Sequence, residues 1–265
     1  MVFSLANFTL NLIRAGNIAA FIVTLIVNGL STTTFFNNRT TSEVSDAYPT
    51  LITPPGYVFS IWSIIYVLLA IFVIYQALPN QKTKPYQKQI GALFILSSLF
   101  NIVWLLLWQY DYITISVAAM LALLATLITI YLRLNIGRSN SPIIEKICVH
   151  LPFSVYLGWI TIATIANIAA ALVSVGWDGF GISAETWTII VLVVALIITL
   201  LVIATRKDVA YSLVVVWALV GIAVKEGAAP NIVVTAQIAI LIIFIALALA
   251  IAFYILRGKR RVVYR

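Results

Sequence analysis

Charged residues are scarce in this sequence. Only 9% of the 265 residues are Asp, Glu, Lys or Arg, whereas 63% are hydrophobic. A soluble globular domain has about 25% charged and roughly 45–50% apolar residues, so this composition excludes a soluble protein and indicates an integral membrane protein. No polar stretch is long enough to form a separate soluble domain with a core of its own.

Cysteine and histidine each occur once, as Cys148 and His150. A single cysteine excludes an intrachain disulfide and a cysteine-based metal cluster, and we predict no metal site. Both residues precede Pro152 at the start of an apolar segment. Either could act as an axial haem ligand. The alternative, which we favour, is an interfacial histidine and a small buried thiol.

Ionisable residues are missing from the middle of every apolar segment, because each carboxylate, lysine and arginine lies in a loop or at a segment end. Proton relays, ion pathways and retinal Schiff bases need such residues inside the membrane. Their absence disfavours a carboxylate-driven proton-coupled transporter, a microbial-rhodopsin-like pigment and an intramembrane metalloenzyme. No acid, base and nucleophile gather within one segment either, so we expect no catalytic residues and no enzyme.

Eight apolar segments are each suited to a helix that crosses a hydrocarbon core of about 30 Å. They are residues 16–35, 57–78, 89–109, 113–134, 147–173, 186–204, 209–224 and 232–256. The predicted fold class is therefore all-α, a polytopic membrane helix bundle of about eight transmembrane helices. We expect the first segment to be retained as a span, because residues 1–13 lack the basic residue that a signal peptide would carry.

The loops alternate along the chain between those rich and those poor in basic residues. If the N-terminus is cytoplasmic, all sixteen basic residues except Arg39 and Lys225 fall on the cytoplasmic side of eight spans. This asymmetry follows the positive-inside rule. We therefore predict a multi-pass protein with both termini in the cytoplasm, in a bacterial plasma membrane. The net charge of +8 reflects this topology, and we expect no nucleic-acid partner.

The loop of residues 31–53 is the longest polar stretch and falls on the non-cytoplasmic side. It is either a lid over a membrane entrance or a plain solvated loop. The loop leads into Pro54 and Pro55, which cannot continue a helix from upstream but can begin one. Phe59, Trp62 and Tyr66 then share one face of the second segment. They form an aromatic face at a membrane entrance.

Uncharged polar and aromatic side chains recur in the third and fifth segments. Asn101, Trp104 and Trp108 share one helix face in the third segment, and Trp159 and Asn167 lie in the fifth. An asparagine in hydrocarbon needs a partner, so Asn101 and Asn167 should face protein, a pocket or each other. A pocket for a flat apolar ligand and simple interhelical packing both fit these residues.

The remaining aromatic residues divide by depth. Tryptophan and tyrosine at segment ends commonly form interfacial belts. To such belts we assign Trp108, Tyr110, Tyr112, Trp177 and Trp187. Four tryptophans lie deeper in their segments, where an interfacial belt does not explain them: Trp62, Trp104, Trp159 and Trp217.

Three motifs lie on the second, third and fifth segments. They are PPGYVFSIWSIIY at 54–66, FNIVW at 100–104 and WITIATIAN at 159–167. They resemble the Pro-Pro-x-Trp-Val-Phe…Val-Trp-Thr-x-Leu-Tyr, Leu-Asn-x-x-Trp and Trp-x-x-Phe-Ala-Thr-x-Leu-Asn motifs of the TspO/MBR family, the tryptophan-rich sensory or translocator proteins. Two departures are Tyr57 in place of a family tryptophan and an interval from Val58 to Trp62 that is one residue short. The likeness covers about residues 10–175.

The resemblance implies a five-helix membrane core with an internal pocket closed by the loop after the first span. We therefore predict a TspO-like core at residues 1–175 and a three-helix membrane extension with a basic cytoplasmic tail at residues 176–265. Members of this family bind porphyrins and other tetrapyrroles, and some bind sterols, so haem or protoporphyrin is a candidate ligand. The predicted ligand-binding residues, from the resemblance and the aromatic face together, are Tyr57, Phe59, Trp62, Tyr66, Asn101, Trp104, Trp159, Ala163 and Asn167.

Three functions stay open at this point. The first is a sensor or transporter that binds a flat hydrophobic ligand, either a tetrapyrrole or a sterol-like molecule. The second is a small-molecule permease in which all eight spans form the path, and the third is a structural membrane protein without a ligand. The expected partners are the lipid bilayer and a hydrophobic small molecule, and a homodimer also stays open.

Overall fold

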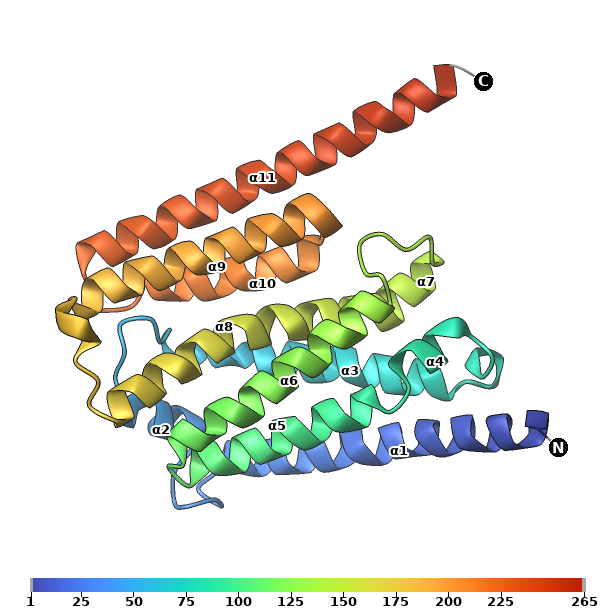
Figure 1. Ribbon diagram of the computed structural model, residues 1–265, viewed down its shortest axis with the longest axis horizontal. Helices are drawn as coiled ribbons and strands as arrows, with labels where there is room; N and C mark the ends of the chain where they lie inside the picture. Colours follow the sequence, from blue (N-terminus) through green and yellow to red (C-terminus); the bar gives the residue numbers. More distant parts are fainter. Residues whose placement is uncertain (1, 264–265) are drawn as a thin grey trace.

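The protein is an elongated bundle of helices that run back and forth along one axis (Figure 1). The structure is a computed structural model that describes the backbone of residues 2–263 and the side chains of residues 10–253 and 256. Within these residues it contains helices and no strand. The prediction of an all-α membrane bundle is confirmed.

Eight long helices account for the eight predicted segments. They are α1 (Val2–Ser31), α3 (Ile61–Ala77), α5 (Leu93–Gln109), α6 (Ile113–Arg133), α8 (Leu151–Ser174), α9 (Ala184–Arg206), α10 (Val209–Ala223) and α11 (Pro230–Val263). The connections contain the short helices α2 (Thr41–Ala47), α4 (Pro85–Ile90) and α7 (Ile143–Glu145), the 3₁₀ turns η1 (Gly56–Ser60), η2 (Pro79–Gln81) and η4 (Gly179–Gly181), and the π-helical turn η3 (Lys146–His150).

Six helical stretches in the described residues are long and apolar enough to cross a membrane. The other two long helices, α5 and α10, are apolar but have only 17 and 15 residues. At 1.5 Å per residue they measure about 26 and 23 Å, less than the hydrocarbon core of about 30 Å. α10 tolerates this because it packs against α8, α9 and α11, so protein surrounds much of its length.

The two termini lie at the same end of the bundle (Figure 1). This arrangement follows from an even number of passes, with one tight turn after another; the turn between α5 and α6, for example, is made by Asp111 in a left-handed conformation at φ 62°. The side chains of the basic residues from 257 to 265 lie outside the described residues. The orientation of the bundle relative to the cytoplasm stays a prediction.

The helices form layers, with α11 outermost, then α9 and α10, then α8 with α3 and α6, and finally α5 and α1 (Figure 1). α8 is the helix on which the two predicted units meet. A methyl group on Gly158 of α8 would lie 3.0 Å from the carbonyl oxygen of Tyr211 in α10, so the missing side chain lets the two backbones approach closely. The division of the chain at residue 175 stays a prediction.

Asp208 lies at a segment end, as the sequence indicates, but it is buried. The hydroxyl of Tyr131 donates to its Oδ2 at 2.8 Å, and the hydroxyl of Ser154 lies 2.6 Å from both carboxylate oxygens. The backbone N–H of Tyr211 donates to Oδ1 at 3.1 Å, which caps α10. One carboxylate therefore joins α6, α8 and α10.

Candidate functional site

Trp62 is the centre of a cluster of aromatic rings. Its ring is stacked on Tyr66 of the same helix, at 5.6 Å between centroids, and on Trp104 of α5 at 6.2 Å. The rings of Tyr156 and Trp159 in α8 meet it edge to face at 6.0 and 6.3 Å. These separations and tilts are the ones that aromatic quadrupoles favour. Three helices thus converge on Trp62.

Amide side chains hold the cluster in register. The Nδ2 of Asn28 in α1 donates to Oδ1 of Asn101 at 2.8 Å. Oδ1 of Asn167 accepts from the indole of Trp104 at 3.1 Å, and its Nδ2 donates to the hydroxyl of Ser116 at 2.9 Å. Of the three predicted surroundings of the two asparagines, which were protein, a pocket or each other, the structure shows protein partners for both. The network fixes α1, α5, α6 and α8 relative to one another.

Two cavities lie on either side of the Trp62 cluster. The larger, which we call the entrance cavity, has a volume of about 600 Å³ and lies between α1, α2, α3 and α5. Its walls include Asn28, Thr41, Trp62, Tyr66 and Trp104. The inner cavity is small, at about 40 Å³, and continues toward α8. Both cavities are lined by Phe59, Trp62 and Trp104, so these aromatic rings form the wall between the two cavities.

Most of the predicted site residues are brought together here. Trp159, Ala163 and Asn167 line the inner cavity. Asn101 lies behind the walls, buried and bonded to Asn28. Tyr57 lines neither cavity, because its ring is half exposed and packs edge to face on Trp217 of α10 at 6.0 Å.

Three buried donors in this region lack a hydrogen-bond partner. They are the hydroxyl of Tyr66, the indole Nε1 of Trp159 and the Nδ2 of Asn101, and none of them meets an acceptor among the described residues. Buried polar atoms in folded proteins nearly always have a partner, so an unpartnered donor beside a cavity calls for an explanation. Polar atoms of a bound ligand would provide the missing acceptors.

The segment of residues 32–53, which we call the entrance loop, closes this end of the bundle and contains α2. The guanidinium of Arg39 forms an ion pair with Asp111 in the turn between α5 and α6. The hydroxyl of Tyr48 donates to the same carboxylate at 3.1 Å. Burial, reinforced by the Asp111 carboxylate, raises the pKa of Tyr48, so its hydroxyl keeps its proton. The loop is therefore latched onto Asp111.

Breaking this latch should speed the passage of a ligand through the entrance. In Asp111→Asn the ion pair with Arg39 is lost, and the pair is only about one third exposed, so we expect the closed loop to lose about 1 kcal/mol. That corresponds to roughly fivefold faster ligand release, which stopped-flow mixing would measure. Asp178→Asn, in a different loop, is the control, and unchanged release in Asp111→Asn would show that the loop does not gate the cavity.

α10 supports the start of α3 from the side away from the cavities. The indole of Trp217 donates to the carbonyl of Val58 at 3.0 Å. The ammonium of Lys225 donates to the carbonyls of Thr50 and Thr53 at 3.3 and 2.9 Å. A methyl group on Gly221 would lie 2.4 Å from Cγ2 of Val58, so the glycine lets α10 contact η1 directly. The C-terminal helices therefore hold the wall of the entrance in place.

Several of these residues were not predicted from the sequence. Asn28, Ser116 and Tyr156 are polar residues on predominantly apolar helices, and a polar side chain in a span is the one signal that points to them. The prediction that Trp108 belongs to an interfacial belt is wrong, because it is buried and its indole donates to the carbonyl of Thr41 at 3.2 Å. Trp108 instead fastens α2 to α5.

Cys148 and His150 both lie in η3, which follows α7 near the opposite end of the bundle from α2 (Figure 1). Neither is among the residues that line the entrance or inner cavity. His150 is buried, whereas Cys148 is partly exposed. The arrangement therefore offers no support for an axial haem ligand at either position.

Comparison with known proteins agrees with this geometry. The model of the family described as TSPO-like protein matches residues 12–250. The match extends through α9 and α10 into α11, beyond the five spans to which the sequence motifs pointed. Searches of curated proteins and of solved structures found no match to this chain. Because the family model covers nearly the whole bundle, the chain belongs to the TSPO-like protein family.

Proposed function

We propose that this membrane protein binds a flat hydrophobic ligand, a tetrapyrrole or a sterol-like molecule, in the entrance cavity, and that it acts as a sensor or transporter of that ligand. The observation that carries the proposal is the aromatic wall of Phe59, Trp62 and Trp104 between two cavities. The volume of the entrance cavity, about 600 Å³, falls within the usual range for small-molecule sites. The cavity supports a binding function over a purely structural one.

The chemistry of the wall suits a ligand with a flat face and a polar edge. Indole and phenol rings attract planar apolar molecules by stacking. The unpartnered hydroxyl of Tyr66, which lines the entrance cavity, would bind a carboxylate or hydroxyl group at the ligand's edge. Membership of the TSPO-like protein family is consistent with a ligand of this kind.

Among the residue types that ligate haem iron, the lining of the entrance cavity includes Tyr66 but no histidine, cysteine or methionine. The aromatic wall would hold a porphyrin by the face of its ring whether or not the ring carries iron. Protoporphyrin without iron is for this reason the most direct probe of the site.

Titration of the purified protein with protoporphyrin tests the proposal through the shift of the porphyrin Soret band. We expect saturable binding with one ligand per chain. Trp62→Ala removes the central ring of the wall and should weaken binding by about 2 kcal/mol, roughly thirtyfold in Kd. Trp187→Phe in α9 changes a tryptophan that does not line the entrance cavity and should leave the affinity unchanged.

Two results would argue against the proposal. One is the absence of saturable binding for both protoporphyrin and a sterol at micromolar concentration. The other is an equal loss of affinity in Trp62→Ala and Trp187→Phe, since that would show that binding does not depend on the residues that line the entrance cavity. Uptake of protoporphyrin by proteoliposomes distinguishes a transporter, which moves the ligand across the bilayer, from a sensor, which only binds it.

A further inference from the structure

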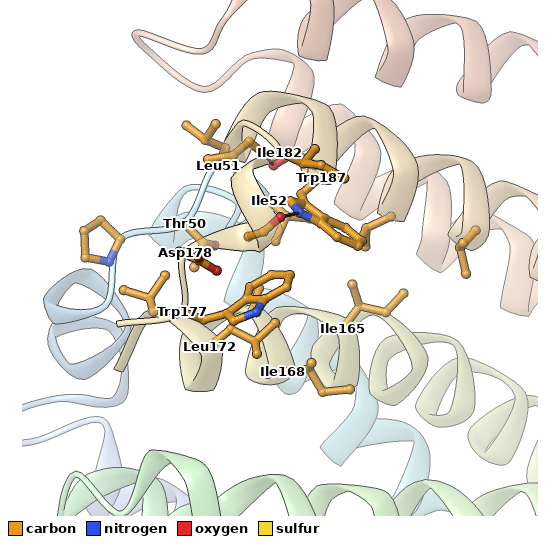
Figure 2. Close-up of a pocket in the computed structure, with 18 residues that line it drawn as sticks. Thr50, Leu51, Ile52, Ile165, Ile168, Leu172, Trp177, Asp178, Ile182 and Trp187 are labelled. Carbon is orange, nitrogen blue, oxygen red and sulfur yellow. Dashed lines mark hydrogen bonds between the residues drawn. The ribbon is translucent and has the colours of Figure 1, made fainter. Parts of the chain in front are cut away.

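A third cavity lies between α8 and α9 (Figure 2). We call it the lateral cavity, and its volume is about 470 Å³. α8 contributes Ile165, Ile168 and Leu172, and α9 contributes Trp187 and Val191. The entrance loop closes one end with residues 49–52. No function assigned so far uses this space.

The sequence of α8 explains why one helix can border two cavities. Ala163 and Ala166 face the inner cavity, whereas Ile165, Ile168 and Ala169 face the lateral cavity. Residues three and four apart share a helix face, so the two sets lie on different sides of α8. The small residues leave space on both sides, and each cavity can be filled by a substitution that does not touch the other.

The rim of the lateral cavity is aromatic and acidic. The rings of Trp177 and Trp187 lie 5.2 Å apart, and the Trp187 indole donates to the carbonyl of Gly179 at 2.8 Å, which fixes the ring (Figure 2). Beside them, Oδ1 of Asp178 accepts from the backbone N–H of Phe180 at 2.9 Å. In the part of the chain that the structure describes, the Asp178 carboxylate has no ion-pair partner.

One basic group beside the entrance loop is already engaged. Lys225 donates to the carbonyls of Thr50 and Thr53, and it is not among the residues that line the lateral cavity. The rim thus presents one unpaired negative charge next to two indole rings, an arrangement that attracts organic cations.

We propose that the lateral cavity binds an amphiphile with an apolar chain and an ammonium head group. The chain would lie between α8 and α9, whose lining side chains are almost all aliphatic and border the bilayer. The head group would lie at Trp177, Asp178 and Trp187. This assigns a second binding site to the chain, separate from the entrance cavity and independent of the function proposed for it.

Photolabelling tests the site directly in micelles of dodecyl maltoside, a neutral detergent without an ammonium group. The probe is a dodecyl trimethylammonium salt with a diazirine on its chain, and peptide mass spectrometry locates the label. We expect labelling of α8 and α9 around Ile168 and Val191. Ala169→Phe fills the lateral cavity and should reduce the labelling at least tenfold, while protoporphyrin binding stays within twofold.

The matched control is Ala163→Phe, at a position on a different face of α8 that lines the inner cavity. It should fill the inner cavity and leave the photolabelling unchanged. Val194→Phe fills the lateral cavity from α9 and decides the outcome if Ala169→Phe does not fold. Labelling that survives both lateral substitutions would overturn the proposal, even if protoporphyrin binds as expected; loss of protoporphyrin binding alone would not affect it.

The head group is tested with a second probe, the dodecyl alcohol with the same diazirine. Wild-type protein should prefer the ammonium probe by about two- to fivefold, the size expected of a cation beside exposed aromatic rings. Asp178→Asn should reduce this preference without changing the position of the label, because only the rings of Trp177 and Trp187 then remain to attract the cation. Equal labelling by the two probes in the wild-type protein would show that the cavity does not recognise an ammonium group.

Discussion

Gly221→Leu is expected to destabilise the bundle by at least about 3 kcal/mol and to weaken protoporphyrin binding. Even a methyl group at this position would lie 2.4 Å from Cγ2 of Val58 and 3.3 Å from Cβ of Pro54. Val58 is fully buried, and its carbonyl is bonded to Trp217, so it has little freedom to move. Overpacking of a rigid contact costs about 1–3 kcal/mol for a few methylene groups, and leucine adds more.

The expected loss of affinity follows from what Val58 does. It lies in η1, directly before the residues that form the aromatic wall, so displacing it moves Phe59 and Trp62. The thermal unfolding midpoint in detergent and a protoporphyrin titration measure the two effects. A variant with normal stability and normal affinity would show that α10 does not position the entrance.

Val220→Leu is the matched control for Gly221→Leu, because the neighbouring valine points outward and is exposed. It adds volume to the same helix without a clash, so the unfolding midpoint and the affinity for protoporphyrin should change little. Combining Gly221→Ala with Val58→Ala gives a double-mutant cycle. Removing the valine methyl groups should relieve the clash, so the cost of Gly221→Ala should be smaller in the Val58→Ala background.

Asp208→Ala should cost about 4 kcal/mol of stability, the second large effect. The substitution leaves the buried hydroxyls of Tyr131 and Ser154 without their acceptor and removes the cap of α10. An orphaned buried donor costs about 1–3 kcal/mol, and loss of an N-cap about 1 kcal/mol. Thermal or chemical unfolding of the purified protein measures the loss.

Asp208→Asn and Ser183→Ala provide the comparison. Asparagine keeps one acceptor oxygen but turns an NH₂ group toward a hydroxyl donor, so the cost should be intermediate. Ser183 caps α9 and is exposed, so Ser183→Ala should cost only about 1 kcal/mol. If Asp208→Ala and Ser183→Ala cost the same, the carboxylate acts only as a cap and does not join three helices.

The spans could be predicted from the sequence because each is defined locally. Long apolar runs, turn residues such as Asp111 and the alternation of basic loops mark eight segments, and the long helices of the structure lie on them. The lengths of α5 and α10 could not be judged in the same way. Whether a 15-residue helix is adequate depends on how much of it protein encloses, which is a property of the assembled bundle.

The candidate site was predictable in part. Phe59, Trp62 and Tyr66 share a face by helical periodicity alone, and all three line the entrance cavity. Tyr57 precedes the regular helix, and its ring packs on Trp217, which is far away in the sequence. A periodic pattern indicates which residues share a face, but it does not indicate which distant helix that face meets.

The sequence by itself determined the class of this protein, the positions of its eight long helices and the three motifs that point to its family, because composition and periodicity are local properties. Only the tertiary structure decided that Asn101 pairs with Asn28, that Asp208 is buried between three helices, and that α10 holds the entrance through Gly221. The physical reason is that these features arise from close contacts between helices far apart in the chain. Such contacts depend on the shape left by every neighbouring side chain, which no local pattern records.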